Sequence, residues 1–297
     1  MRTFEYVVPK TIKEAVALLQ ERGAAVLAGG TDLLLRMKGR EYGPRIVIDI
    51  KQIKGFDELR LTSGGDLVIG PAVTMRQIER AEEVRRDYQA VAQGAEVVGS
   101  VQIRNRATLI GNVCNAAPSA DTSPGLLALG ARVRIAGPTG RRSLGLDNFF
   151  IGPGRSALKR GELVTGVQLP AVGLRTGSAY VRHTTRGAMD IAAVGVGVAL
   201  MLADDGKVCE AAAIALGAVA STPMRARAAE GMVRGQVLTP QLIAAVAEKA
   251  ADEAKPISDV RASAGFRREL VRVLTGRMIE TALENARQRA AAQRRVA

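Results

Sequence analysis

The stretch Ala107-Thr-Leu-Ile-Gly-Asn-Val-Cys-Asn-Ala-Ala-Pro-Ser-Ala-Asp-Thr122 indicates the fold of this chain more directly than any other. Its sixteen positions include a glycine, a proline, two asparagines and an aspartate. Residues of these types favour turns over regular structure, and their short polar groups can line the site of a polar ligand. We therefore expect a ligand-binding loop over residues 107–122.

A second stretch of small residues, Ala25-Val-Leu-Ala-Gly-Gly-Thr-Asp-Leu33, follows a short apolar segment. Adjacent Gly29 and Gly30 let backbone N–H groups approach an anion closely, and Thr31 adds a hydroxyl donor. The alternative is a tight turn followed by a helix cap at Thr31 or Asp32. Because there are two such stretches, we favour one large ligand held from two sides. Neither stretch has the spacing of a Rossmann or P-loop glycine motif.

Composition limits the kind of chemistry that the chain can perform. The 297 residues are 47% hydrophobic and 24% charged, which is typical of globular proteins with two or three domains. Two cysteines and one histidine exclude a four-cysteine iron–sulfur or zinc site and leave little basis for histidine-dependent catalysis. Any redox chemistry would therefore depend on an organic cofactor.

The formal net charge of +13 indicates an anionic partner, which could be a nucleic acid, a phosphate-bearing cofactor or an acidic subunit. A basic surface without any partner is the alternative. Aromatic residues make up only 3% of the chain and tryptophan is absent, so we expect no nucleic acid partner. The longest apolar run, residues 191–203, is shorter than the roughly 20 residues of a membrane span. We expect a cytoplasmic protein with no membrane span.

Patterning along the chain predicts an α+β protein. Helix and strand patterns alternate at first, whereas strands at 192–202 and 208–216 around an Asp-Asp-Gly turn predict a hairpin before two helices, 239–254 and 262–289. We place the domain boundary near Val172-Gly173. The expected units are a first domain of residues 1–172, with subdomains of about 1–55 and 56–172, a second domain of 173–290, and a tail of 291–297.

The two small-residue stretches resemble those of the FAD-binding medium subunit of the xanthine dehydrogenase and carbon monoxide dehydrogenase family. Members carry Ala-Gly-Gly-Thr-Asp-Leu-Leu, which matches residues 28–34, and a Thr-Ile-Gly-Gly-Asn motif that ends in Asp, which matches residues 108–121. Five further segments match in order, at residues 150–155, 161–165, 186–197, 216–225 and 262–268. The resemblance therefore covers almost the whole chain.

The resemblance implies a two-part FAD-binding domain of the vanillyl-alcohol-oxidase (PCMH) type, followed by a smaller α+β domain with an antiparallel sheet and helices. It also implies that FAD passes electrons from a [2Fe–2S] small subunit to an external acceptor. A molybdopterin large subunit would oxidise the substrate, and the assembly would be a dimer of heterotrimers. Some relatives carry a further four-cysteine cluster, which the two cysteines of this chain exclude.

The resemblance also assigns roles to residues, none of them catalytic. The backbone of Ala28–Thr31 would bind the FAD pyrophosphate, with Thr108, Gly111 and Asn112 on its other side. Asp121 would hold a ribose or ribityl hydroxyl, although a helix N-cap is the alternative. Val164 would lie beside the adenine, and Arg182 would lie near the flavin or, alternatively, be a surface arginine. The expected cofactor contacts are Leu27, Ala28, Gly29, Gly30, Thr31, Asp32, Thr108, Ile110, Gly111, Asn112, Asp121, Val164 and Arg182.

Ile110 is where the chain departs from the family pattern, because relatives have glycine at this position. A β-branched residue does not readily adopt a positive φ, so we expect ordinary backbone angles there. Two other functions remain open at this point. The chain could be a stand-alone flavin oxidase of the same fold, or a basic assembly or nucleic-acid-binding protein that lacks the cofactor.

Overall fold

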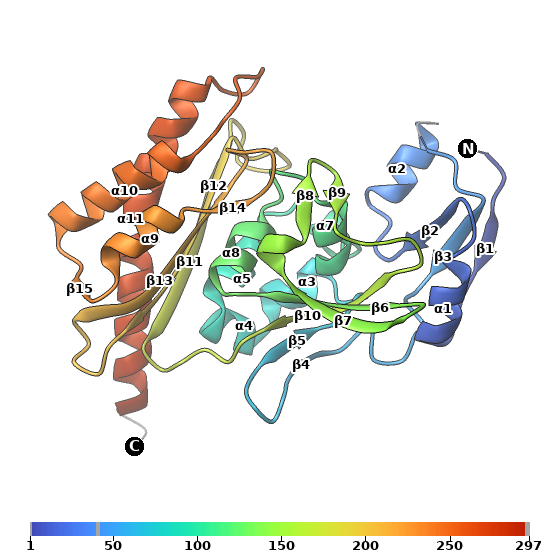
Figure 1. Cartoon of the computed structure of the whole chain (residues 1–297), viewed down its shortest axis with the longest axis horizontal. Coiled ribbons are helices and arrows are strands. Elements are labelled where there is room, and N and C mark those ends of the chain that lie inside the picture. Colours follow the sequence, from blue (N-terminus) through green and yellow to red (C-terminus); the bar gives the residue numbers. More distant parts are fainter. Residues whose placement is uncertain (1, 40–41, 295–297) are drawn as a thin grey trace.

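The computed structural model describes residues 2–39 and 42–294. Figure 1 shows an elongated molecule, with a small N-terminal unit at one end and long C-terminal helices at the other. A central unit lies between them and contacts the C-terminal sheet through two of its helices, α5 and α8. None of the helices in the described residues is both long enough and apolar enough to cross a membrane.

The N-terminal unit is a three-stranded parallel sheet in the order β1 (Glu5–Val7), β3 (Ile46–Asp49), β2 (Ala24–Leu27). Helix α1 (Ile12–Leu18) connects β1 to β2, and α2 (Leu33–Lys38) connects β2 to β3. The hydroxyl of Thr11 accepts a hydrogen bond from the Glu14 N–H and so caps α1.

The central unit is built on a five-stranded antiparallel sheet in the order β4-β5-β10-β6-β7. The helices of this unit pack on one face of the sheet, and side chains along β6 therefore alternate between a buried and an exposed face, as Val133 and Arg134 do. Helix α1 packs against one end of the sheet, at Ala136 and Leu163. The bounds of its strands are β4 (Leu59–Leu61), β5 (Leu67–Ile69), β6 (Arg132–Gly137), β7 (Gly140–Gly145) and β10 (Leu163–Leu169), with a separate pair β8 (Phe150–Gly152) and β9 (Arg155–Ser156). Its helices are α3 (Met75–Arg80), α4 (Glu82–Asp87), α5 (Gln89–Glu96), α6 (Val101–Arg104), α7 (Leu109–Asn115), α8 (Thr122–Ala128) and the short 3-10 helix η1 (Leu146–Asn148).

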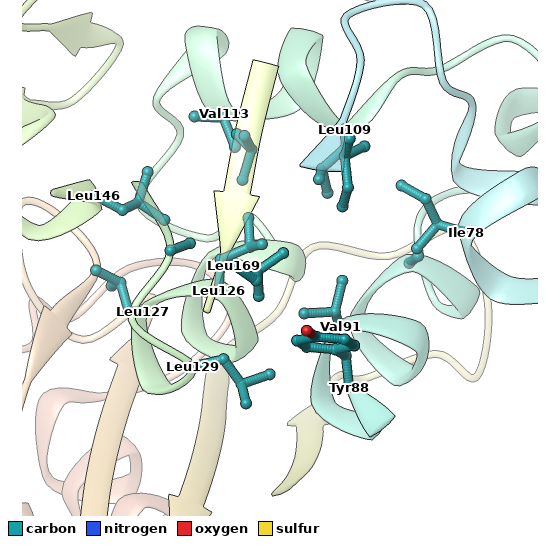
Figure 2. Packing of buried hydrophobic residues seen from close by; sticks show 14 of the residues in the cluster. Ile78, Tyr88, Val91, Leu109, Val113, Leu126, Leu127, Leu129, Leu146 and Leu169 are labelled. Atoms are coloured by element: carbon teal, nitrogen blue, oxygen red, sulfur yellow. The ribbon is translucent and has the colours of Figure 1, made fainter. Parts of the chain in front are cut away.

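The core of the central unit forms where these helices meet the sheet. Figure 2 shows Ile78 of α3, Val91 of α5 and Leu109 of α7 directed toward Leu126 and Leu169. Burying one such side chain contributes about 2 kcal/mol, so the core holds the helices firmly on the sheet.

The C-terminal unit has an antiparallel sheet that is covered on both faces. One face packs against the long helix α11, and the Cβ of any side chain at Gly177 would lie 2.1 Å from the Ala282 carbonyl. On the other face, a Cβ at Gly197 would lie 2.6 Å from the Pro124 backbone of α8. The strands are β11 (Thr176–His183), β12 (Val194–Leu202), β13 (Val208–Gly217), β14 (Met224–Arg225) and β15 (Gln236–Val237), and the helices are α9 (Arg227–Val233), α10 (Pro240–Glu253) and α11 (Ala264–Arg294).

Several sequence expectations are confirmed, and two are wrong. The β12–β13 hairpin is present, and the helix expected over 239–254 is α10. The stretch 107–122, expected to be a loop, contains helix α7, because the Thr108 hydroxyl caps it and its apolar side chains face the core. The long C-terminal helix continues through Arg294 instead of ending near residue 289.

Candidate functional site

A cavity of about 720 Å³ lies where the three units meet. Its walls come from the β2–α2 turn, from residues 107–121, from the start of β10 and from two residues that precede β12. A volume of this size is typical of small-molecule and cofactor sites. The two small-residue stretches of the sequence therefore face the same space.

The first stretch is a true loop, and close packing explains its glycines. A Cβ at Gly29 would lie 2.2 Å from the carbonyl oxygen of Arg106, so no side chain fits there without a backbone shift. Gly30 has φ +77°, a conformation that favours glycine. The chain that leaves β2 thus runs directly against the chain that enters α7, and the two stretches form one continuous wall.

The second stretch is organised by the cap of α7. The Thr108 hydroxyl accepts from the Gly111 N–H at 3.1 Å, and a Cβ at Gly111 would lie only 2.9 Å from that hydroxyl oxygen. The Oδ1 atom of Asn112 accepts from the Thr122 hydroxyl at 2.7 Å, which fixes the orientation of its amide. Glycine at 111 therefore keeps the capped turn free of a side chain at the cavity wall.

Ile110 lies in the first turn of α7 and is 4% exposed. Only three non-glycine residues in the described part of the chain have positive φ, namely Ala116, Met189 and Ala218. The expectation of ordinary backbone angles at Ile110 is therefore confirmed. Its side chain forms part of the cavity wall and contributes to the core.

Asp121 and Arg182 form a buried ion pair beside the cavity. The Asp121 carboxylate accepts from the Tyr180 hydroxyl at 2.8 Å and from Arg182 Nη1 at 2.7 Å. Burial raises the pKa of Asp121 to about 6, although Arg182 and Tyr180 act in the opposite direction. The side chain of Asp121 makes no capping bond to α8, and that of Arg182 is only 6% exposed. Both alternatives, a helix cap and a surface arginine, are therefore wrong.

Most of the residues expected at the cofactor line this cavity. Leu27 and Arg182 do not; Leu27 packs beneath Gly30, and Arg182 approaches the cavity only through Asp121. The expected residues that line it are Ala28, Gly29, Gly30, Thr31, Asp32, Thr108, Ile110, Gly111, Asn112, Asp121 and Val164.

Sequence reasoning missed the contribution of the C-terminal unit. Asp190 and Ile191, in the connection between β11 and β12, close one side of the cavity. The Asp190 carboxylate accepts from the backbone N–H groups of Arg186 and Ile191, each at 2.8 Å, and these bonds hold its pKa below the usual value. Met189 adopts φ +51° in the same turn. The only signal was that this segment belongs to one of the matched family segments.

Three other lining residues have little sequence signal. The guanidinium group of Arg36 lies over the Tyr42 ring, 5.0 Å from its centroid, at one side of the cavity. Burial raises the pKa of the Cys114 thiol to about 12, so this wall group stays neutral and unreactive. His183 packs against Phe266 instead of lining the cavity.

Two family models match the chain in succession. The first, described as the FAD binding domain in molybdopterin dehydrogenase, matches residues 2–172. The second, described as the CO dehydrogenase flavoprotein C-terminal domain, matches residues 179–282. The chain belongs to this FAD-binding family of molybdopterin dehydrogenases. It is thus a flavoprotein subunit of an oxidoreductase, and its cofactor is FAD.

Members of the family resemble the chain over nearly its full length. The xanthine dehydrogenase FAD-binding subunit of Escherichia coli O157:H7 is 32% identical, over 93% of this chain and 94% of that protein. The carbon monoxide dehydrogenase medium chain of Hydrogenophaga pseudoflava is 31% identical, over 95% and 96%. A solved structure of carbon monoxide dehydrogenase from that organism superposes with a TM-score of 0.90 at 31% identity, covering 96% of this chain and 98% of its own.

The cavity of this family member fits FAD on its own geometry. A Cβ at Gly29 would collide with the Arg106 carbonyl, and one at Gly30 would press on Leu27 and Leu34, so this turn of the cavity wall requires glycine at both positions. The fold expected from the resemblance, a two-part FAD-binding domain followed by a smaller α+β domain, is confirmed.

Proposed function

We propose that the chain is the electron-transfer subunit of a molybdenum hydroxylase. It would receive electrons from a [2Fe–2S] cluster on a small subunit and deliver them to an external acceptor, while a molybdopterin large subunit oxidises the substrate. The relatives include medium chains of dehydrogenases, which by that name work beside other chains. We further propose a dimer of heterotrimers in the cytoplasm; the free thiols of Cys114 and Cys209 suit a reducing compartment.

One observation carries this proposal: both small-residue stretches, which lie in the matched FAD binding domain, line one cavity of about 720 Å³. FAD supplies the redox chemistry when bound, since it can exchange electrons singly with a cluster and in pairs with an acceptor. The role left to the chain is to bind and orient this cofactor. We assign pyrophosphate binding to the turn Ala28–Thr31 and to Thr108, Gly111 and Asn112, with Val164 beside the adenine.

The ion pair of Asp121 suggests how the two domains cooperate. Both carboxylate oxygens already accept a hydrogen bond, yet each has a further lone pair that could accept from a ribose or ribityl hydroxyl. Arg182 also donates to the Asp190 carbonyl at 3.1 Å. We propose that Arg182 acts by fixing Asp121 and the turn before β12, and that residues 1–172 and 173–290 are the two cooperating domains.

Spectroscopy of the purified chain tests the proposal. After reconstitution with FAD we expect flavin absorption bands, no bleaching by organic substrates, and copurification of an iron–sulfur protein and a large molybdenum protein from the source cells. Absence of flavin bands would refute the assignment. Bleaching by a substrate without partners would instead support a stand-alone oxidase, and salt-sensitive DNA binding without flavin would support a basic nucleic-acid-binding protein.

A further inference from the structure

The open face of the central sheet contains a second hollow, of about 410 Å³. Helices α3, α5 and α7 lie on the other side of this sheet, and the hollow shares no lining residue with the cofactor cavity. Strand β10 separates the two, because Val164 lines the cavity and its neighbour Thr165 lines the hollow.

Basic side chains dominate the lining of this hollow. Five cationic residues and a single acidic residue, Glu58, contribute to its lining, although the Arg142 side chain is directed to the other face of the sheet with Ile135. They come from four separate segments, so the charge results from the fold and not from a local run in the sequence. The five are Lys54, Arg60, Arg134, Arg141 and Arg142.

Internal ion pairs neutralise only two of these cations. Arg60 binds Glu58 at 3.0 Å, and Arg142 binds Glu162 at 2.7 Å. Lys54, Arg134 and Arg141 form no salt bridge with any residue in the ranges 2–39 and 42–294. Three exposed cations thus remain around one hollow without a partner.

Strand register places two of the uncompensated cations on one face. Arg134 of β6 lies opposite Ser143, and Arg141 of β7 lies opposite Ala136, two residues further along. Side chains at such diagonal positions are near enough for like charges to repel. This repulsion would be relieved by an anion bound between them.

We propose that this hollow is a binding site for an oligophosphate, either free or as the tail of a nucleotide. Arginine binds phosphate oxygens through two parallel N–H donors, and the rigid strands hold these side chains at fixed spacing. Ser143 and Thr165 bring hydroxyl groups to the same wall. The one aromatic lining residue, Phe56, is 2% exposed, so no ring is available to stack on a base. Recognition therefore rests on the phosphate chain.

The test is calorimetric titration of the FAD-saturated chain with tripolyphosphate and, separately, with ATP. Saturating FAD keeps phosphate out of the cofactor cavity, and the flavin spectrum reports that occupancy independently. We expect one saturable site for tripolyphosphate whose affinity decreases as salt rises from about 50 to about 300 mM. Equal affinity for both ligands would identify the phosphate chain alone as the ligand, whereas tighter ATP binding would identify a nucleotide.

Charge-neutral variants locate the site. The double variant Arg134→Gln/Arg141→Gln should bind tripolyphosphate at least about tenfold more weakly, because it loses two charge-assisted contacts. Arg234→Gln, which removes an exposed arginine of the C-terminal unit outside the hollow, should bind like the wild type. All three side chains are exposed, so flavin content should be unchanged.

Several results would overturn the proposal. If the FAD-loaded wild type binds no tripolyphosphate, or if the double variant binds it as tightly as the wild type does, the result contradicts the proposed site. The same holds if sulfate binds as tightly as tripolyphosphate at matched ionic strength. A glutamate oligomer of the same charge that binds as tightly as tripolyphosphate would also overturn it, because the surface would then recognise charge and not phosphate.

Discussion

The two small-residue stretches at the cofactor cavity reach the same wall by different means. Residues 28–32 form a turn in which Gly29 presses against the Arg106 carbonyl and Gly30 has a left-handed backbone. Residues 108–115 form a capped helix whose glycine has ordinary backbone angles. Glycine is thus required by contact with a distant segment in the first stretch, and by a neighbouring cap in the second. Composition alone does not distinguish these two causes.

The largest effect should come from Gly29→Ala. Its Cβ would lie 2.2 Å from the Arg106 carbonyl, so the two stretches must separate. We expect loss of FAD binding and a drop of about 3 kcal/mol or more in the free energy of unfolding. Flavin absorbance and denaturant titration measure the two effects. Gly231→Ala, where a Cβ meets nothing within 4 Å, is the control and should retain FAD. If Gly29→Ala also retained FAD, the contact between Gly29 and Arg106 would not limit the side chain at this position.

Ile110→Gly would restore the residue of relatives within α7. The variant removes a buried side chain and adds a helix glycine, which together should lower the free energy of unfolding by about 3 kcal/mol. Because the backbone at Ile110 is helical, we expect FAD affinity per folded molecule to change by less than about threefold, a shift under 1 kcal/mol. Fluorescence titration of the folded protein checks this, and a large gain in affinity would mean that Ile110 obstructs the cofactor.

The burial of Asp121 predicts a pH effect that Asp121→Asn should remove. The pKa of Asp121 is about 6 when folded and about 3.9 when unfolded. The folded state therefore retains this proton more strongly. The contribution to stability is full below about pH 4 and is lost as pH rises through about 6, with a total of about 3 kcal/mol.

Comparison of the wild type with Asp121→Asn isolates this contribution from other carboxyl groups, such as Asp259, whose pKa is lowered to about 2. The difference in unfolding free energy between the two proteins should change between pH 4 and 6 and be constant above pH 7. A difference that is constant over the whole range would show that the Asp121 pKa is not raised.

The smallest effect should come from Thr108→Ala, which removes the cap of α7. Loss of the bond to the Gly111 N–H should lower the unfolding free energy by about 1 kcal/mol and weaken FAD binding. Thr239→Ala removes the corresponding cap of α10, far from the cavity, and should lower stability similarly with unchanged FAD affinity. Equal FAD affinity in both variants would contradict a role for Thr108 in the cavity wall.

Local patterns predicted those features that depend on neighbouring residues. The hairpin of β12 and β13 and the helix α10 follow from residue spacing and alternation. Helix α7 was missed because its residue types favour turns, while its stability comes from the burial of Leu109 and Val113 against other elements. The family resemblance, and not periodicity, identified most of the residues that line the cavity.

By itself the sequence determined the two small-residue stretches, the apolar periodicity of the strands and the excess of basic residues. Only the tertiary structure decided that Gly29 meets Arg106, that Asp121 pairs with Arg182, and that Asp190 closes the cavity. It also decided that cations from four segments gather on one open sheet face. The physical reason is that periodicity and capping act over a few residues, whereas close approach, burial and ion pairing join segments far apart in the chain.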